Sequence, residues 1–220
     1  DIEEGKYIGW DDIRLPTLSA FKRRGFRPGA FVRYIHELGP SKVDKKVSYE
    51  EFMKAIYSFN KDIIENEANR YFFVENPYEI KIKDAPELEA EAPLHPDHNE
   101  RGNRIIKTSD KFYVEDKLIK GQMYRFMHLL NFKNKDFHSK EYDPELNAKL
   151  IHWLPVSEDL VKVEVLMPDG SIKKGLGESN LRDLKMGDKI SVYGYFYPKK
   201  DKKTEIEKLF KPLGIINIEK

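Results

Sequence analysis

The chain contains no cysteine among its 220 residues. Disulfide bonds, iron–sulfur clusters, thiolate zinc sites and a thiol nucleophile are therefore excluded. No apolar run approaches the ~20 residues that a membrane-spanning helix needs. The first residues, Asp1-Ile2-Glu3-Glu4, are acidic and do not resemble a secretory signal. These absences favour a cytoplasmic protein, and the missing initiator methionine indicates a chain that begins within a longer protein.

The common catalytic loops are also missing. Neither usual spacing of a glycine-rich phosphate loop is present, and no Gly-x-Ser-x-Gly elbow occurs. Gly175-Leu176-Gly177 lacks both a third glycine and the strand–helix context of a nucleotide loop, so we predict a turn there. The sequence therefore offers no catalytic and no cofactor-binding residue.

What is present is the composition of a soluble globular protein, with 35% charged, 40% apolar and 12% aromatic residues. The length allows two small domains, or one domain with an extension. The net charge is only +1, but basic residues cluster within 21–36 and acidic residues within 81–100. A basic block beside an acidic one favours a partner that binds in one fixed orientation. The alternative is that these charged side chains only solvate a helix face. The basic block consists of Lys22, Arg23, Arg24, Arg27 and Arg33.

The first third of the sequence predicts helices. Pro16-Thr17 before Leu18 is typical of a helix start. Pro28 can begin a second helix, because proline is tolerated in the first turn. Ser48 and Glu51 form a capping box that opens a third helix. A fourth helix is expected from about 61 to 70.

From residue 71 onward, β-rich runs and period-two alternation predict strands. Pro168-Asp169-Gly170 is predicted to be a hairpin turn. Residues 84–104 are rich in proline, acids and histidine, and are predicted to be a loop. Many short strands suggest antiparallel barrels or sandwiches, so the fold is predicted to be α+β in sequence order. The expected strands cover residues 71–74, 78–83, 104–107, 112–115, 123–132, 161–167, 171–174, 190–193 and 195–197.

Two clusters could bind a polyanion. The basic block lies beside phenylalanines on a short helix, which is a rigid support for phosphate contacts. Arg125, Lys133 and Lys135 lie on or just after a predicted strand, among the aromatic side chains of residues 124–132. Such a surface can stack and hydrogen-bond unpaired RNA bases. The alternative is an ordinary strand with solvated basic residues.

One further cluster resembles a metal site. His95, Asp97 and His98 carry zinc-ligand chemistry, but they lie in a proline-containing loop with no third ligand fixed by a regular element. A surface loop without metal is therefore the preferred interpretation. His152-Trp153, between apolar neighbours, is expected to be a core or domain-joint pair.

The stretch Gly9-Trp10-Asp11-Asp12-Ile13-Arg14-Leu15-Pro16-Thr17, followed by Lys22-Arg23-Arg24-Gly25, resembles a signature of glutamyl- and glutaminyl-tRNA synthetases. Ile13 stands where that family usually has proline. Further segments resemble the family's anticodon-binding region in the same order, and one resembles its archaeal glutamate enzymes. These segments are 69–77, 95–104 and 151–155, and, for the archaeal enzymes, 163–170.

The resemblance implies the C-terminal, anticodon-binding part of an archaeal-type class I glutamyl-tRNA synthetase. Its parent protein would ligate glutamate to tRNA, with ATP and magnesium held in a catalytic domain that this chain lacks. Residues 1–75 would form a helical connector that contacts the inner corner of the tRNA, and residues 76–220 would form two antiparallel β-barrels that bind the anticodon. The expected partners are tRNA, specifically tRNA-Glu, and the missing catalytic domain. The chain is expected to be inactive alone, as a fragment or as one subunit of a split enzyme.

The resemblance also assigns roles to individual residues. Arg70 matches an arginine that reads the middle anticodon base in the glutamine enzymes, and Lys133 matches a lysine near the third base. Lys189 and Val192 stand where the family has Gln-x-x-Arg shortly before Gly194-Tyr195-Phe196. Lys189 would supply a point charge without the bidentate fork of arginine. The predicted RNA-binding residues are Lys22, Arg23, Arg24, Arg27, Arg33, Arg70, Arg125, Lys133, Lys135 and Lys189.

Two other functions fit the same sequence. The chain could be the corresponding region of a glutaminyl-tRNA synthetase, because substrate choice lies in the missing domain. It could also be a β-barrel protein-interaction module that does not bind RNA. Basic residues on one continuous surface would favour RNA, whereas scattered basic residues with a large apolar patch would favour a protein partner.

Overall fold

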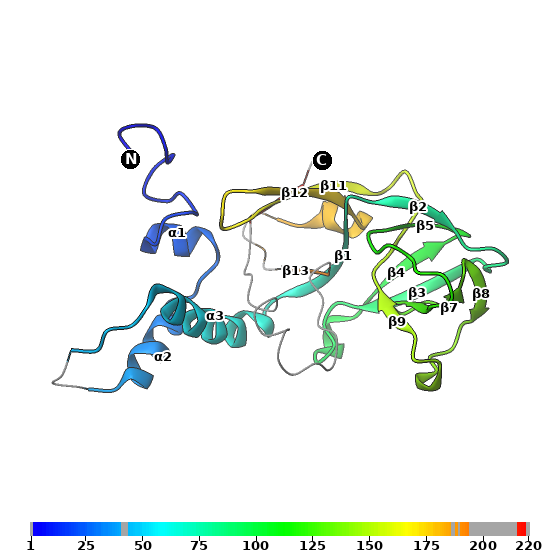
Figure 1. Ribbon diagram of the computed structural model, residues 1–220, viewed down its shortest axis with the longest axis horizontal. Coiled ribbons are helices and arrows are strands. Elements are labelled where there is room, and N and C mark those ends of the chain that lie inside the picture. The colour runs from blue at the N-terminus through cyan, green and yellow to red at the C-terminus, as the bar shows by residue number, and fades with distance from the viewer. Residues whose placement is uncertain (1, 41–43, 186–187, 189, 194–214, 219–220) are drawn as a thin grey trace. The chain divides into compact units, whose positions relative to one another are not determined.

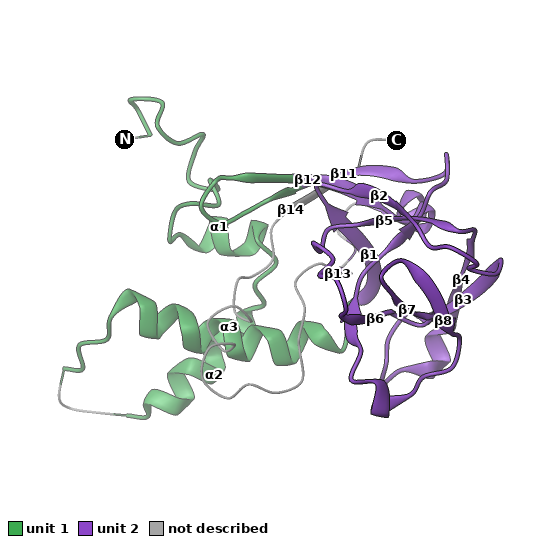
Figure 2. Cartoon of the chain, turned by 45° about the vertical axis from the view of Figure 1, so that its right-hand side comes forward, with its two compact units in different colours: residues 1–68, 165–173, 196–216 green, residues 69–164, 174–195, 217–220 purple. Residues whose placement is uncertain are grey.

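The computed structural model describes residues 2–40, 44–185, 188, 190–193 and 215–218 (Figure 1). The chain forms two compact units (Figure 2). Among the described residues, no helix has both the length and the apolar character needed to cross a membrane. The first unit comprises residues 1–68, 165–173 and 196–216, and the second comprises 69–164, 174–195 and 217–220.

The first unit is built on helices that begin where the sequence predicts. Thr17 caps α1 (Leu18–Arg23) by accepting a hydrogen bond from the Ala20 N–H at 3.0 Å. Proline occupies the first turn of α2 (Pro28–Leu38). The capping box at α3 (Tyr49–Glu65) is complete, because Ser48 and Glu51 each accept a hydrogen bond from the other's backbone N–H.

The predicted fourth helix is wrong. No glycine or proline interrupts α3, so the third helix runs on to Glu65. The backbone of Arg70 then donates to the carbonyl of Leu94 at 2.8 Å, in strand β1 (Asn69–Glu75). The change from helix to strand therefore falls at 66–69, before the predicted domain boundary at 75.

A small aromatic-rich core holds the helical unit together. Phe21, Phe26, Met53 and Ile56 are buried, and the partly buried rings of four other residues pack against them. The Phe21 and Phe26 rings meet edge-to-face with centroids 5.2 Å apart, which is a favoured aromatic geometry. The surrounding rings are those of Phe31, Tyr34, Phe52 and Tyr57.

Apart from short 3-10 helices at Asn99–Arg101, Pro144–Leu146 and Ser179–Asp183, the remaining described elements are short strands in four sheets. The sheet orders are β13-β1-β12-β11-β14, β10-β5-β2, β3-β4 and β8-β7-β6-β9. The predicted α+β composition is present in the described residues. The β1/β13 and β6/β9 pairs are parallel, so these sheets are not antiparallel throughout, as predicted barrels of antiparallel strands would be. The strands after β1 are β2 (Tyr78–Lys81), β3 (Leu88–Pro93), β4 (Asn103–Thr108), β5 (Lys111–Val114), β6 (Met123–Phe126), β7 (Asn131–Lys133), β8 (Asp136–Ser139), β9 (Lys149–Ile151), β10 (Leu154–Pro155), β11 (Val161–Leu166), β12 (Ile172–Gly177), β13 (Ile190–Tyr193) and β14 (Ile215–Ile218).

Several predicted strands are confirmed, among them 71–74, 104–107, 112–115 and 190–193. The predicted strand 123–132 is two strands, β6 and β7, joined by a tight turn in which His128 has a φ of 60°. The hairpin at Pro168–Gly170 is confirmed, since the Met167 N–H donates to the Ser171 carbonyl at 2.8 Å. The predicted strand at 195–197 lies outside the described residues.

Two further sequence predictions among the strands are wrong. Residues 84–104 contain β3 and the start of β4, whose inward positions include the small residues Ala90 and Ala92. The Gly175-Leu176-Gly177 segment is strand rather than turn. A Cβ at Gly175 would lie 2.1 Å from the Val74 carbonyl oxygen, so glycine permits a close approach of two backbones.

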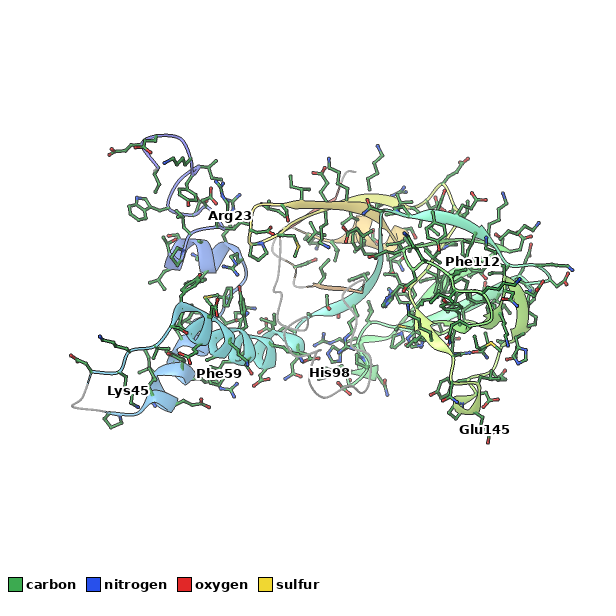
Figure 3. The ribbon with its side chains drawn as sticks, in the orientation of Figure 1. Arg23, Lys45, Phe59, His98, Phe112 and Glu145 are labelled. Carbon is green, nitrogen blue, oxygen red and sulfur yellow. The ribbon has the colours of Figure 1, made fainter. Side chains whose placement is uncertain are left out.

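The core of the second unit is centred on Trp153, which is 0% exposed. Its indole N–H donates to the Met127 carbonyl at 2.9 Å, and its ring lies 5.6 Å from that of Phe112. Figure 3 labels Phe112 among the densely packed side chains of this unit. His152 is also buried and meets the Phe72 ring edge-on at 5.8 Å. The prediction of a core pair at His152-Trp153 is confirmed.

Candidate nucleic-acid interface

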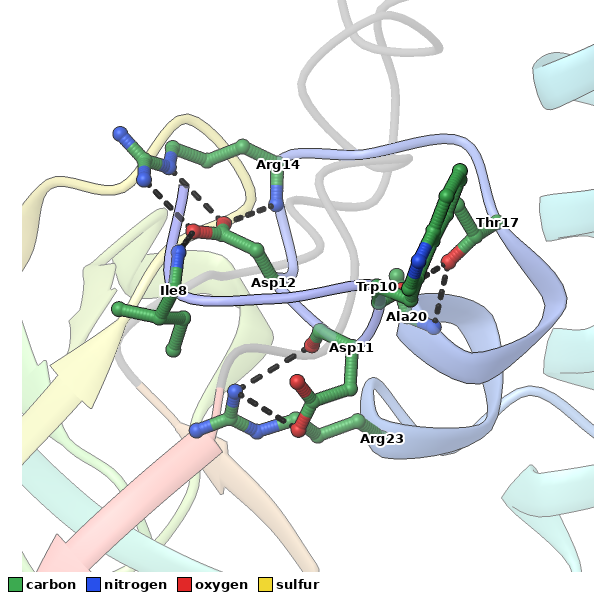
Figure 4. A network of polar contacts seen from close by, with 8 residues as sticks. All are labelled: Ile8, Trp10, Asp11, Asp12, Arg14, Thr17, Ala20 and Arg23. Atoms are coloured by element: carbon green, nitrogen blue, oxygen red, sulfur yellow. Dashed lines mark hydrogen bonds and ion pairs between the residues drawn. The ribbon is translucent and has the colours of Figure 1, made fainter. Parts of the chain in front are cut away.

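An ion pair between the buried Asp12 and the exposed Arg14 shapes the segment before α1 (Figure 4). Asp12 is 3% exposed, and its carboxylate accepts from Nε and Nη2 of Arg14 at 2.9 and 2.6 Å. The same carboxylate accepts from the backbone N–H of Ile8 at 3.1 Å. Hydrogen bonding from Arg14 lowers the pKa of Asp12 far below its usual range. The Asp12 carboxylate therefore stays charged, and its hydrogen bonds hold the backbone of the segment that leads into α1.

Three arginines of the basic block already face a carboxylate. Arg23 Nη1 lies 3.4 Å from Asp11 (Figure 4), and Arg33 Nη1 lies 3.2 Å from Asp62. Arg27 pairs with Glu67. Exposed pairs of this kind contribute only ~0–1 kcal/mol. A phosphate can replace such a carboxylate at small cost, so these pairs leave the arginines available to a polyanion.

Lys22 and Arg24 are only two positions apart in the sequence but have different environments. Lys22 is exposed on the last turn of α1. Arg24 is only 5% exposed, donates a hydrogen bond to the hydroxyl of Tyr57, and lies over the Phe26 ring at 5.1 Å. The guanidinium of Arg24 is therefore covered by its own protein. A phosphate would have to displace core aromatics to reach this guanidinium, which argues against the predicted RNA contact of Arg24.

The second set of basic residues lies on the outer face of the sheet β8-β7-β6-β9. Arg125 on β6 pairs with Asn131 on β7, and Met123 pairs with Lys133, so these side chains project from one face of the sheet. Lys133 is exposed there, and Leu150 of β9, which neighbours Arg125, is 39% exposed.

The aromatic side chains expected beside these basic residues point the other way. Tyr124, Phe126 and Phe132 are 2%, 0% and 0% exposed, and they form the core beneath the sheet. The expectation that these rings stack on RNA bases is therefore wrong. Strand alternation explains it, since residues adjacent in sequence point to opposite faces.

Lys135 lies in a two-residue turn between β7 and β8. Asn134 and Lys135 have φ values of 53° and 68°, as a type I′ hairpin requires. The Asn134 side chain accepts from the Gly121 N–H at 2.7 Å, which fixes the turn. The turn presents an exposed lysine at the edge of the same sheet.

A loop after β8 completes this face, and sequence reasoning did not identify it. Arg125 Nη1 donates to the carbonyls of Lys140 and Glu141 at 3.1 and 3.2 Å. The buried Asn131 side chain donates to the Glu141 carbonyl at 2.6 Å. The next residue, Tyr142, is 72% exposed, and the Arg125 guanidinium lies 5.4 Å from its ring centroid. The only sequence signal for this residue is an aromatic side chain in a polar stretch.

The resemblance also suggests roles for Arg70 and Lys189, and the structure describes only the first of them. Arg70 is half-buried near the start of β1, with Ser191 of β13 beside it in the parallel register. Lys189 and the Gly194-Tyr195-Phe196 motif lie outside the described residues.

The histidine cluster has a structural environment within the second unit. His95 is 1% exposed, and its Nδ1 accepts from the Asp97 N–H at 3.1 Å. The His98 ring lies 4.6 Å from that of His95 and its Nδ1 is 2.9 Å from Glu100. Within the described part of the chain, no three histidine or acidic side chains gather as a metal site would require. His95 is therefore a buried residue within a loop whose next residues, Pro96 and Asp97, are exposed.

The chain is similar to proteins of one family over nearly its whole length. It is 39% identical over 217 residues to Glutamate–tRNA ligase of Methanobrevibacter smithii, an alignment of 95% of this chain and 38% of that protein. It is 38% identical over 213 residues to Glutamate–tRNA ligase of Methanocaldococcus jannaschii, covering 92% of this chain and 38% of that protein. The Pyrococcus furiosus Glutamate–tRNA ligase is 38% identical over 220 residues, covering 91% and 37%.

The chain thus spans somewhat over a third of the length of these relatives. Residues 68–151 match the model of the anti-codon binding domain of tRNA synthetases class I (E and Q). That segment contains Arg70, the outer face of the sheet β8-β7-β6-β9 and the Tyr142 loop. The chain therefore belongs to the class I tRNA synthetases of the glutamyl and glutaminyl group, with their anticodon-binding domain at residues 68–151.

Proposed function

We propose that this chain recognises tRNA-Glu for a glutamate–tRNA ligase, as the part of that enzyme that binds the anticodon loop and the inner corner of the tRNA. The observation that carries the proposal is the outer face of the sheet β8-β7-β6-β9. Arg125, Lys133 and Lys135 gather there on a rigid support, within the segment matched as an anticodon-binding domain. Cations on such a face suit an RNA backbone, and an open aromatic ring suits an unpaired base.

The helical unit is proposed to contribute backbone contacts. Lys22, Arg23, Arg27 and Arg33 suit phosphate contacts because they are exposed or partly exposed at the protein surface. Such contacts position the RNA and carry no sequence information. The base-reading residues would then come from the second unit, with Arg70, Lys133 and Lys189 as candidates.

The catalytic chemistry is proposed to lie in a part of the enzyme outside this chain. ATP, with magnesium, would bind there and supply activated glutamate. The two β-barrels, their division from the connector at residue 75, and a cytoplasmic location belong to the same proposal and follow the family. We expect no exchange of pyrophosphate into ATP when the 220-residue chain alone is given ATP and glutamate. Such exchange, in a preparation free of host synthetase, would contradict this assignment.

The salt dependence of binding tests the proposal directly. If about five basic side chains neutralise phosphates, the log–log plot of affinity against salt should have a slope of roughly −3 to −5. The measurement is filter binding of the whole chain to a glutamate tRNA transcript, to a glutamine tRNA and to a glutamate tRNA with an altered anticodon. Tighter binding of the glutamate tRNA is expected. A glutamine preference would assign the chain to the glutamine branch, and a flat salt response for all three RNAs would favour a protein-interaction module.

A further inference from the structure

The loop that carries Tyr142 is anchored although the ring itself is exposed. Two side chains from β6 and β7 hold the two peptide groups before Tyr142. Arg125 Nη1 bridges the Lys140 and Glu141 carbonyls at 3.1 and 3.2 Å, and Asn131 donates to the second of them at 2.6 Å. Asn131 is 0% exposed and is also fixed by Ser139 at 2.8 Å. The backbone that carries Tyr142 is therefore anchored before any partner arrives.

The two faces of the Tyr142 ring differ. The guanidinium of Arg125 lies 5.4 Å from the ring centroid, within cation–π range. The residue is nevertheless 72% exposed, so the side of the ring away from Arg125 is open to solvent. An exposed ring usually loses side-chain entropy when it binds a partner, and one held by its loop and by a cation has less to lose. This geometry suits a flat partner that stacks.

The surroundings indicate what that flat partner is. Lys133 lies on the same face of the sheet, with Lys135 in the adjoining turn, and both are exposed. A partner that joins a flat apolar group to a negative charge would stack on the Tyr142 ring and pair with the lysines. A nucleobase in single-stranded RNA has these two properties, and base–aromatic stacking accepts any base because each has a π-face.

We propose that Tyr142 is a stacking platform for one unpaired nucleobase of the tRNA anticodon loop, and that Arg125 is a positioning residue that holds the platform. This inference rests on the proposed function, because it identifies one RNA contact of that function. It also changes the role expected for Arg125, whose Nη1 is engaged by three protein oxygens. Arg125 acts on the RNA through Tyr142 instead of through a phosphate.

The test uses the whole chain and an RNA hairpin with the anticodon stem and loop of a glutamate tRNA. The fluorescent base 2-aminopurine is placed at one unpaired loop position at a time, because stacking on an aromatic ring quenches it. At one position, the wild-type chain is expected to quench the fluorescence, Tyr142→Phe to retain the quenching, and Tyr142→Ala to abolish it. Tyr142→Ala should also bind the hairpin about 5- to 150-fold more weakly, the range typical of one stacked base.

Tyr49→Ala is the matched control, because Tyr49 is a 55% exposed tyrosine on α3, outside the anticodon-binding segment. It should leave both quenching and hairpin affinity unchanged. Full affinity and unchanged fluorescence at every position with Tyr142→Ala would overturn the platform, while wild-type binding would leave the proposed function standing. A wild-type chain that binds neither the hairpin nor whole tRNA would overturn the proposed function itself.

The role of Arg125 is tested by combining substitutions. If Arg125 acts through the platform, Arg125→Ala weakens binding in the wild-type background but has little effect in the Tyr142→Ala background. In both backgrounds, Arg125→Ala should leave the salt slope of binding unchanged. Arg125→Gln keeps a donor for the loop carbonyls, so it should retain part of the quenching that Arg125→Ala loses. A direct phosphate contact would instead shrink the slope by about 0.7 in both backgrounds and overturn the positioning role.

Discussion

Arg104 Nε lies 2.5 Å from a carboxylate oxygen of Glu178, and the two side chains are 4% and 2% exposed. The other Glu178 oxygen accepts from the Phe72 N–H at 2.9 Å, and Arg104 Nη1 donates to the Pro93 carbonyl at 2.8 Å. Burial raises the pKa of Glu178, while its partner Arg104 favours the charged form. The pair therefore ties β1 and β4 to the turn after β12 inside the second unit.

The first prediction concerns this pair. Glu178→Ala should destabilise the chain by about 3–5 kcal/mol, because it leaves the Arg104 charge buried without its partner. Arg104→Met should cost a similar amount, and the double variant clearly less than the sum of the two. Guanidinium unfolding of the three variants forms a double-mutant cycle. Strict additivity would show that the two side chains act independently.

The second prediction separates Lys22, on the last turn of α1, from Arg24, the C-cap residue of that helix. Lys22→Ala should reduce the magnitude of the salt slope of tRNA binding by about 0.7–0.9 and leave stability unchanged, because an exposed lysine neutralises one phosphate. Arg24→Ala should instead lower stability by about 1–3 kcal/mol, because it removes a buried side chain that packs on the Phe26 and Tyr57 rings. A stable Arg24→Ala variant with a reduced slope would place that arginine back on the RNA surface.

The third prediction tests the role carried over to Arg70. If Arg70 reads a base edge, Arg70→Ala should cost ~1–3 kcal/mol more with cognate tRNA than with a tRNA whose middle anticodon base is changed. Arg23→Ala should weaken both about equally, since phosphates look alike in every sequence. Calorimetry on the four protein–RNA pairs at one salt concentration makes the comparison. Equal losses with Arg70→Ala would leave Lys133 and Lys189 as the better candidates for reading the anticodon.

Features set by neighbouring residues were predictable from the sequence. Helix starts depend on a cap within one turn, so Thr17 and Ser48 identified α1 and α3. The β1 strand was predictable because it contains aromatic and β-branched residues, which favour strands. β3 was missed because its inward positions include the small Ala90 and Ala92, between glutamates, and alanine gives a weak period-two signal.

Features set by distant contacts were not predictable. Gly175 looks like a turn residue until the Val74 backbone lies beside it in the sheet. Lys22 and Arg24 form one basic run in sequence, and only the packing of Tyr57 from α3 shows which of them is covered. Tyr142 resembles any exposed aromatic residue, because the side chains that hold its loop come from β6 and β7. The candidate site was therefore predictable as a set of cations, but its geometry was not.

The last prediction concerns stability in mild acid. Burial lowers the pKa of His152 to about 3, whereas an unfolded histidine titrates near its ordinary value of 6.5. Between these values the unfolded chain binds a proton that the folded chain does not, so stability falls as pH falls below about 6.5. From pH 7 to pH 5 this residue alone should cost about 2 kcal/mol. The His152→Gln variant has no titrating group at this position. From pH 7 to pH 5 its free energy of unfolding should therefore fall by about 2 kcal/mol less than that of the wild type, measured by guanidinium unfolding at both pH values. The contributions of His128 and Glu178 are present in both proteins and cancel in the comparison. An NMR titration of the wild-type ring measures the same shift, and a His152 pKa near 6.5 would contradict the prediction.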